Sequence, residues 1–421
     1  MASTVQFPIP FLTFIFFSTL SMAQNPFLPD AMVLPVTKDL STLQYVTELQ
    51  MGKPLSPVKL VIDLSGPFLW LDCASFTPSL SKFPVQSCSI ECSMAKSGGY
   101  STTPTVKDQN KTCSVQLENP ISKMVSFGEL KEGIVAIEVT DGLKTGSLAT
   151  VPRFLFSCTE KSLLNGLGNG VKGTLGLGKS RISLLSQVSS TFNFLRKFSL
   201  CLSSSNGFII SGENHHFDGG HVSRSMLYTP LAFNEEKSSK GYYLKVNSIK
   251  INSKKLSISK SLFMSNQEGG GGTRISLTVP YTTMESTLYS TFTKAYIQAA
   301  TAVNITRVSS MAPFGVCFSS KGVEKTRVGP KVPIIELVLQ SDMVKWKIEG
   351  RNSMVHVSDE VMCLGFLDGG LSSSIVIGSY QLEDRFLEFN LGNSMLGFSA
   401  SYLLMGGRSC SDLISNPITT L

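Results

Sequence analysis

The sequence VIDLSGPFLWLD, residues Val61–Asp72, carries the pattern that decides the fold. An apolar run ends in Asp63, a short Ser-Gly turn follows, and a second apolar run closes on Leu69 and Trp70. Short apolar runs bounded by turn residues are typical of buried strands. A carboxyl group at a strand end becomes a candidate catalytic group when a second ionisable group meets it. The remaining sequence must therefore show whether Asp63 has a partner.

Length and composition indicate a globular protein built mainly from strands. The chain has 421 residues, which leaves room for two or more domains with cores of their own. Hydrophobic residues make up 42% and charged residues 16%, which excludes a disordered chain. Glycine, serine, threonine and the β-branched residues are abundant. We predict an all-β fold with short helices.

The first 23 residues have the features of a secretory signal peptide. Residues Met1–Ala23 contain no charged side chain, Phe7–Leu20 is apolar, and Ser21–Ala23 is a small-x-small cleavage pattern. The alternative is a membrane anchor, but the run is shorter than the ~20 residues that a span needs. No later stretch offers a membrane span, so we expect a secreted protein of the extracellular space or cell wall.

Nine cysteines agree with an oxidising compartment, and their odd number leaves at least one thiol over. Asn110 and Asn304 each begin an Asn-x-Thr glycosylation motif, which matters only in a secreted chain.

The net charge of +7 comes from scattered basic residues. No spacing typical of a nucleic-acid-binding module is present, so we expect no nucleic acid partner. Weak attraction to an acidic cell-wall polysaccharide and an ordinary solvated basic surface both remain open, and we favour the second.

A histidine cluster is the one candidate for metal binding. It combines His215, His216 and His221 with Glu213 and Asp218. The segment is polar and lies where two halves of the chain would join, so an exposed linker loop is the favoured interpretation. We expect no metal and no cofactor.

Each half of the chain repeats the same order of patterns. Leu43–Leu49 and Gly241–Ile251 both alternate as strands do, and Thr273–Pro280 (TRISLTVP) is an apolar strand and turn like that at Asp63. Lys172–Gly178 (KGTLGLG) is matched by Ser374–Gly378 (SIVIG). We expect each apolar-glycine run to cross close to the turn of its own half, because glycine lets backbones approach.

This duplication predicts two related β lobes, with residues 24–222 in the first and 223–421 in the second, and a cleft between them. Two helices are expected. One begins after Ser183, which would cap it, and the other covers Ser286–Ala300 with an apolar face.

Together these patterns resemble the two-lobed pepsin-like aspartic protease fold. Within it, the chain resembles the plant group of extracellular dermal glycoproteins and basic 7S globulins, which includes inhibitors of xylanases and of xyloglucan-specific endoglucanases. The motifs that carry this resemblance are LQYVTEL, IDLSG-x-FLWLDC, FLFSC, KGTLGLG, FSLCL, GYYLKV, NITRV, PFGVCFSS, CLGF and VIGSYQLED. They extend from Gln44 to Cys410.

The resemblance also implies that catalysis is lost. Pepsin-like proteases need two carboxyl groups that share one proton. Asp63 has the first position, but Ser276 stands at the second, and a serine hydroxyl does not ionise at any useful pH. The turn glycines are replaced by Ser65 and Thr278, and Val125–Thr140 lacks the flap signature of a Tyr followed by Gly-Thr-Gly. We therefore expect a non-enzyme in which Asp63 survives as a turn residue.

The family pattern implies three disulfides, which are Cys73–Cys158, Cys201–Cys410 and Cys317–Cys363. The group carries six further cysteines after the first one, and this chain keeps only Cys88, Cys92 and Cys113 there. We predict a Cys88–Cys113 pair with Cys92 free, although the sequence leaves this connectivity open.

Inhibitors of the group insert side chains from loops of the second lobe into a glycosidase cleft. Endoglucanase inhibitors present one arginine before the last cysteine and another in a Thr-Arg-hydrophobic-Gly-Pro loop. Arg408 and Arg327 fit these places. Glycosidases cut with paired carboxylates, and a guanidinium pairs well with a carboxylate. The terminal loop lacks the histidine of xylanase inhibitors, so the expected partner is an endoglucanase of a pathogen. The alternatives are a binding or storage-type globulin and, less favoured, an active aspartic endopeptidase.

Overall fold

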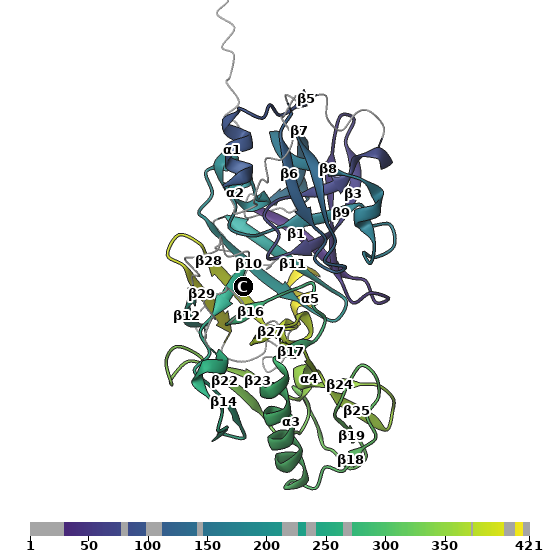
Figure 1. Cartoon of the computed structure of the whole chain (residues 1–421), viewed down its shortest axis with the longest axis vertical. Helices are drawn as coiled ribbons and strands as arrows, with labels where there is room; N and C mark the ends of the chain where they lie inside the picture. The colour runs from purple at the N-terminus through teal and green to yellow at the C-terminus, as the bar shows by residue number, and fades with distance from the viewer. Residues whose placement is uncertain are drawn as a thin grey trace, which may run out of the picture.

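A computed structural model describes residues 29–76, 83–97, 112–140, 146–212, 226–232, 241–263, 272–371, 374–399 and 409–415. The predicted signal peptide and the predicted boundary at 222/223 lie outside these residues. The molecule is two-lobed and mostly β (Figure 1). No helix within the described ranges is long and apolar enough to cross a membrane.

Six antiparallel strands join the two lobes, in the order β1–β11–β10–β28–β29–β12. Three come from the first half of the chain and three from the second, so the sheet has the same arrangement on either side of its centre. Phe198 on β10 stacks on Phe389 on β28 with ring centroids 4.6 Å apart. Their bounds are Ala31–Lys38 (β1), Asn206–Gly212 (β11), Lys197–Leu202 (β10), Phe386–Asn390 (β28), Met395–Ser399 (β29) and Met226–Ala232 (β12).

The first lobe is built around a long hairpin. β7 pairs with β8 on one side and with β6 on the other. β7 is one strand of 16 residues with a register shift between Gly133 and Val135. The strands of this lobe are Tyr45–Met51 (β2), Ser56–Asp63 (β3), Trp70–Asp72 (β4), Phe83–Pro84 (β5), Ser114–Glu118 (β6), Val125–Thr140 (β7), Ser147–Thr159 (β8) and Gly173–Gly176 (β9).

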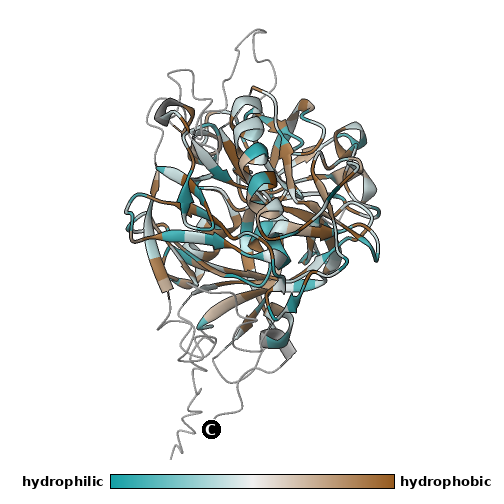
Figure 2. Ribbon diagram, turned by 90° about the horizontal axis from the view of Figure 1, so that it is seen from below, coloured by the Kyte–Doolittle hydropathy of each residue, from teal (hydrophilic) through white to brown (hydrophobic). Residues whose placement is uncertain are grey.

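The second lobe uses smaller sheets, and Figure 2 shows hydrophobic stretches of strand in the interior of the molecule. One group of strands surrounds the Ser276 turn: Tyr242–Leu244 (β13), Thr273–Ile275 (β16), Thr282–Met284 (β17), Phe366–Asp368 (β26) and Ile375–Ile377 (β27). One four-stranded sheet contains Ser248–Ile251 (β14), Lys254–Lys255 (β15), Ile335–Val338 (β22) and Lys345–Ile348 (β23). A second four-stranded sheet contains Arg307–Val308 (β18), Cys317–Ser319 (β19), Met354–His356 (β24) and Val361–Leu364 (β25). Lys325–Thr326 (β20) and Gly329–Pro330 (β21) form a hairpin.

Both predicted helices are confirmed. Ser183 caps α2 (Leu184–Phe192) by accepting a hydrogen bond from the Ser186 N–H, and three apolar side chains of α2 are buried. α3 (Ser286–Thr301) buries side chains at four-residue spacing, as one face of a helix requires: Leu288, Phe292, Tyr296 and Ala300. The shorter helices are Ile90–Lys96 (α1), Gly350–Ser353 (α4) and Cys410–Ser415 (α5).

Three disulfides form as the family pattern implies: Cys73–Cys158, Cys201–Cys410 and Cys317–Cys363. The predicted Cys88–Cys113 pair is wrong. Cys92 pairs with Cys113, and Cys88 is a free, exposed thiol. The reason is α1, which begins at the Ser89 cap; the Ser89 hydroxyl accepts from the Cys92 N–H at 3.1 Å. This first turn buries Cys92 beside Cys113 and leaves Cys88 outside the helix.

Candidate functional site

The same crossing of strands supports a turn in each lobe. In the first lobe β9 lies between β3 and β4, parallel to β3, with Asp63 opposite Gly176. In the second lobe β27 lies between β16 and β17, parallel to β16. A Cβ on Gly176 would lie 2.5 Å from the Gly66 carbonyl oxygen, and one on Gly378 would collide with the Tyr281 backbone. The expectation that each apolar-glycine run crosses at its turn is confirmed.

The first turn holds Asp63 at the end of β3, with 8% of the residue exposed. Its Oδ1 accepts a hydrogen bond from the Ser65 N–H at 2.8 Å. Burial raises the pKa of Asp63, and the Ser65 N–H together with the Arg274 and Lys123 charges partly oppose this effect. Asp63 is therefore a desolvated carboxyl group whose hydrogen bond maintains the turn.

The second turn repeats this bond with a hydroxyl. The Ser276 Oγ accepts from the Thr278 N–H at 3.3 Å and lies 3.1 Å from the Thr278 Oγ1. Ser276 is buried, with 2% exposed. A side chain at the first position of each turn therefore accepts from the backbone N–H two residues later.

A small cavity connects the two turns. It encloses about 70 Å³ and is lined by residues of both turns, Asp63, Ser65, Arg274 and Thr278 among them. The Arg274 Nη1 donates to the Ser65 Oγ at 3.3 Å, which links the second turn to the first. Pro120 and Lys123, between β6 and β7, also line this cavity.

This arrangement limits the available chemistry. The two turns carry one ionisable carboxyl group, that of Asp63, and the hydroxyl groups of Ser65, Ser276 and Thr278. Pockets that bind small molecules usually enclose about 300–1,000 Å³, so a cavity of this size has room for water rather than a peptide. In the described parts of the chain, no group of three or more His, Cys, Asp or Glu residues could hold a metal ion.

Arg274 and Lys123 were not singled out from the sequence. Alternation along a strand would have found Arg274, because it lies two residues before Ser276 and so shares its face. Lys123 has no comparable local signal, since the fold of the first lobe brings the segment between β6 and β7 to the Asp63 turn.

Arg327 lies in the exposed turn between β20 and β21. The Thr326 hydroxyl shapes this turn by donating to the Gly329 carbonyl at 2.7 Å and accepting from the Val328 N–H at 3.2 Å. Gly329 has a φ of +93°, which suits glycine. The backbone of this hairpin is thus well constrained, and the guanidinium group extends from it.

The structure gives no position for several other residues that the sequence singled out. Arg408, Asn110 and the histidine cluster lie outside the described residues. Asn304 is exposed just beyond the end of α3, so its side chain is accessible, and its glycosylation stays a prediction.

Domain families described as "Xylanase inhibitor N-terminal" and "Xylanase inhibitor C-terminal" match residues 45–213 and 241–400. The chain belongs to the xylanase inhibitor family. Its two matched segments contain the Asp63 and Ser276 turns respectively.

Relatives in the xylanase inhibitor family align over almost the whole chain. A "probable aspartic proteinase GIP2" of Nicotiana benthamiana is 42% identical over 407 residues, 92% of each chain. A "gamma conglutin 1" of Prunus dulcis is 38% identical over 411 residues, 94% of this chain and 92% of the relative. The family as a whole consists of conglutins, 7S globulins and inhibitors that are generally non-catalytic pepsin-like homologues.

Solved structures agree with this assignment. The crystal structure of edgp has a TM-score of 0.83 and 43% sequence identity, and it covers 92% of this chain and 98% of its own. The crystal structure of conglutin gamma from lupine seeds has a TM-score of 0.78 and 33% identity, covering 91% and 98%. The chain therefore has the pepsin-like fold that these solved structures share.

Proposed function

We propose that the protein is a secreted, catalytically inactive member of the xylanase inhibitor family that inhibits a microbial cell-wall glycoside hydrolase. A xyloglucan-specific endoglucanase is favoured over a xylanase as the target. The observation that carries this proposal is Arg327, held exposed on a constrained hairpin of the lobe that matches the "Xylanase inhibitor C-terminal" family. A guanidinium at this position suits the paired carboxylates of a glycosidase.

Inactivity as a protease is supported by the two turns. The Ser276 turn is built like the Asp63 turn but carries a hydroxyl group in place of a carboxyl group, and the cavity between the turns encloses only about 70 Å³. Secretion is supported by four disulfides, which persist in oxidising compartments.

A second candidate function is a binding or storage-type globulin without inhibitory activity. The observation in its favour is that relatives with 32–38% identity are named gamma conglutin and basic 7S globulin. An active endopeptidase is the least favoured alternative. Cleavage of casein at acid pH, if a peptide mimic of the transition state blocked it, would support the endopeptidase instead.

The decisive experiment measures inhibition constants against a panel of xyloglucan-specific endoglucanases and xylanases. We expect inhibition of an endoglucanase, and we expect Arg327→Ala and Arg408→Ala each to weaken it by about 2 kcal/mol, or about 30-fold. Arg307→Ala is the matched control, because Arg307 is another exposed arginine of the same lobe. Inhibition of nothing on the panel would favour the globulin, and unchanged constants in both arginine variants would refute the assigned surface.

A further inference from the structure

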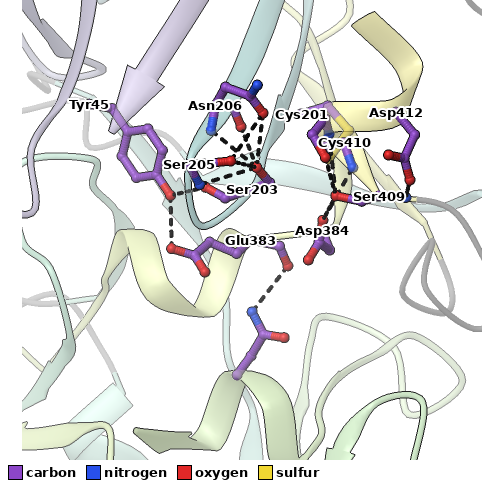
Figure 3. The surroundings of a disulfide bond; sticks show 12 residues. Tyr45, Cys201, Ser203, Ser205, Asn206, Glu383, Asp384, Ser409, Cys410 and Asp412 are labelled. Atoms are coloured by element: carbon purple, nitrogen blue, oxygen red, sulfur yellow. Dashed lines mark hydrogen bonds between the residues drawn. A yellow bond between two sulfur atoms is a disulfide. The ribbon is translucent and has the colours of Figure 1, made fainter. Parts of the chain in front are cut away.

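Asp384 is a buried aspartate whose two carboxylate oxygens hold two different segments of the second lobe. It is 0% exposed and has a φ of +54°, just after the short helix Ser379–Leu382. Its Oδ1 accepts from the Ser409 hydroxyl at 2.9 Å and from the Cys410 N–H at 3.2 Å (Figure 3). Its Oδ2 accepts from the Arg351 Nε at 3.1 Å.

Arg351 continues this contact to the hairpin that carries Arg327. The Arg351 N–H donates to the Val328 carbonyl at 2.7 Å. The two backbones touch so closely that a Cβ on Gly329 would collide with the Arg351 backbone, and one on Gly350 with Pro330. The hairpin therefore rests directly on α4, and the side chain of Arg351 connects α4 to Asp384.

Asp384 also has a fixed position relative to the first lobe. Its N–H donates to the Leu202 carbonyl on β10 at 2.6 Å. The neighbouring Glu383 accepts from the Lys38 ammonium at 2.6 Å and from the Tyr45 hydroxyl at 2.8 Å. These contacts fix the backbone of Asp384 at the junction of the two lobes. Its carboxylate can therefore hold the segments that bind to it in a defined position.

We infer that Asp384 is a positioning residue that joins the Arg327 hairpin to the segment beginning at Ser409, so that the two are oriented as one surface. This inference rests on the proposed function, in which that surface binds a hydrolase. The contacts of Asp384 themselves involve only residues that the structure describes. Asp384 itself is buried and cannot touch a target enzyme. It acts through Arg351 on one side and through Ser409 and Cys410 on the other.

The charges explain why an aspartate suits this place. The carboxylate accepts from one charged donor and two neutral donors, which compensates its burial. An asparagine has nearly the same shape, but it carries no charge for Arg351 and its amide nitrogen cannot accept. Because its single oxygen is also neutral and so a weaker acceptor, Asp384→Asn should weaken both the contact with Arg351 and the contacts with Ser409 and Cys410, while the packing is preserved.

The test compares Asp384→Asn with Asp342→Asn, an exposed aspartate of the same lobe. Hydrogen exchange is followed by mass spectrometry on the full disulfide-bonded protein, well below its melting temperature. In Asp384→Asn we expect at least tenfold faster exchange both in peptides covering 326–331 and 350–353 and in those covering 409–412. Asp342→Asn should leave both unchanged. Acceleration of only one of the two segments would overturn the coupling.

The inhibition constant provides a second measurement. Its coupling to Arg327 would be absent if Asp384 only stabilised the fold. We expect Asp384→Asn to raise the inhibition constant about tenfold, and we expect Arg327→Ala to weaken inhibition less in that background than in the wild type. Strict additivity of the two changes would overturn a positioning role. If the wild type inhibits no hydrolase, the proposed function fails, while hydrogen exchange still decides the coupling.

A second variant is available if Asp384→Asn does not fold. Arg351→Gln removes only the side-chain link between Asp384 and α4, on which the hairpin rests, and it changes a residue that is partly exposed. We expect faster exchange in 326–331 with the 409–412 peptides still protected. Unchanged exchange in 326–331 would show that Arg351 does not carry the connection.

Discussion

The Asp63 turn of the first lobe and the Ser276 turn of the second lobe are built in the same way from different side chains. Each follows a strand that pairs in parallel with a second strand, which ends at Gly176 in the first lobe and is followed by Gly378 in the second. Each turn begins with a side chain that accepts from the N–H two residues later. One acceptor is a carboxyl oxygen and the other is a hydroxyl. The turn therefore needs an acceptor and a close crossing, whereas the acid is needed only for chemistry.

If the close crossing of the strands holds each turn in place, a side chain added at the crossing glycine should have the largest effect on the free energy of unfolding. The effect should be similar in the two lobes. We expect Gly176→Ala and Gly378→Ala each to lower the free energy of unfolding by about 3 kcal/mol or more, since each new Cβ would collide with backbone atoms. Urea denaturation measures this. The control Gly392→Ala, at an exposed glycine, should change it by less than about 0.5 kcal/mol. A small effect in one lobe alone would break the comparison.

A carboxyl group placed in the second turn should cost an intermediate amount. Ser276→Asp would introduce an acid at a position with 2% exposure, so we expect a loss of about 2 kcal/mol in the free energy of unfolding at pH 7. Burial would raise the pKa of the new carboxyl group, so the loss should shrink as the pH falls toward the ordinary range of an aspartate. Ser276→Asn, which cannot ionise, should show no such recovery. A new acid peptidase activity in Ser276→Asp would contradict the conclusion that the cavity between the turns has room for water rather than a peptide.

The smallest expected effect concerns the pH dependence of the first turn. Burial raises the pKa of Asp63 above its ordinary 3.8, so the folded protein binds this proton more tightly than the unfolded chain does. Asp63 therefore lowers stability progressively as the pH rises from 3.8 through the raised pKa, and this loss is complete above it.

Asp63→Asn removes this titration, so its free energy of unfolding should fall less than that of the wild type across the same window. Denaturation at a series of pH values measures the difference. Ser276→Ala, which changes the other turn, should run parallel to the wild type. Parallel curves for Asp63→Asn and the wild type would mean that Asp63 does not titrate as its burial implies.

Much of the fold was predictable because its signals are local and duplicated. The strand ending at Asp63, the Ser183 cap and the two apolar-glycine runs each follow from short stretches of sequence, and the structure contains all of them. The repetition of one pattern in two halves predicts two lobes even where single strands are ambiguous.

The rest depends on contacts between distant residues, which leave no local signal. The cysteine pairing depended on whether the Ser89 cap starts a helix, and so on which cysteine turns inward. Lys123 reaches the Asp63 turn from the loop between β6 and β7, and Asp384 reaches Arg351 and Ser409 across the second lobe. Short stretches of sequence can indicate the turns themselves, but not what the tertiary fold places over them.

The Cys201–Cys410 bond has a consequence for a chain that is cut. It links a strand of the first half to the last helix, across 209 residues. A single backbone break between these cysteines would yield two fragments that stay covalently joined. If the break lies between Leu202 and Glu383, the fragments would also stay paired along β10 and β28 and linked by the Lys38–Glu383 ion pair. The nicked protein should therefore keep its shape as a two-chain molecule and separate only under reducing, denaturing conditions.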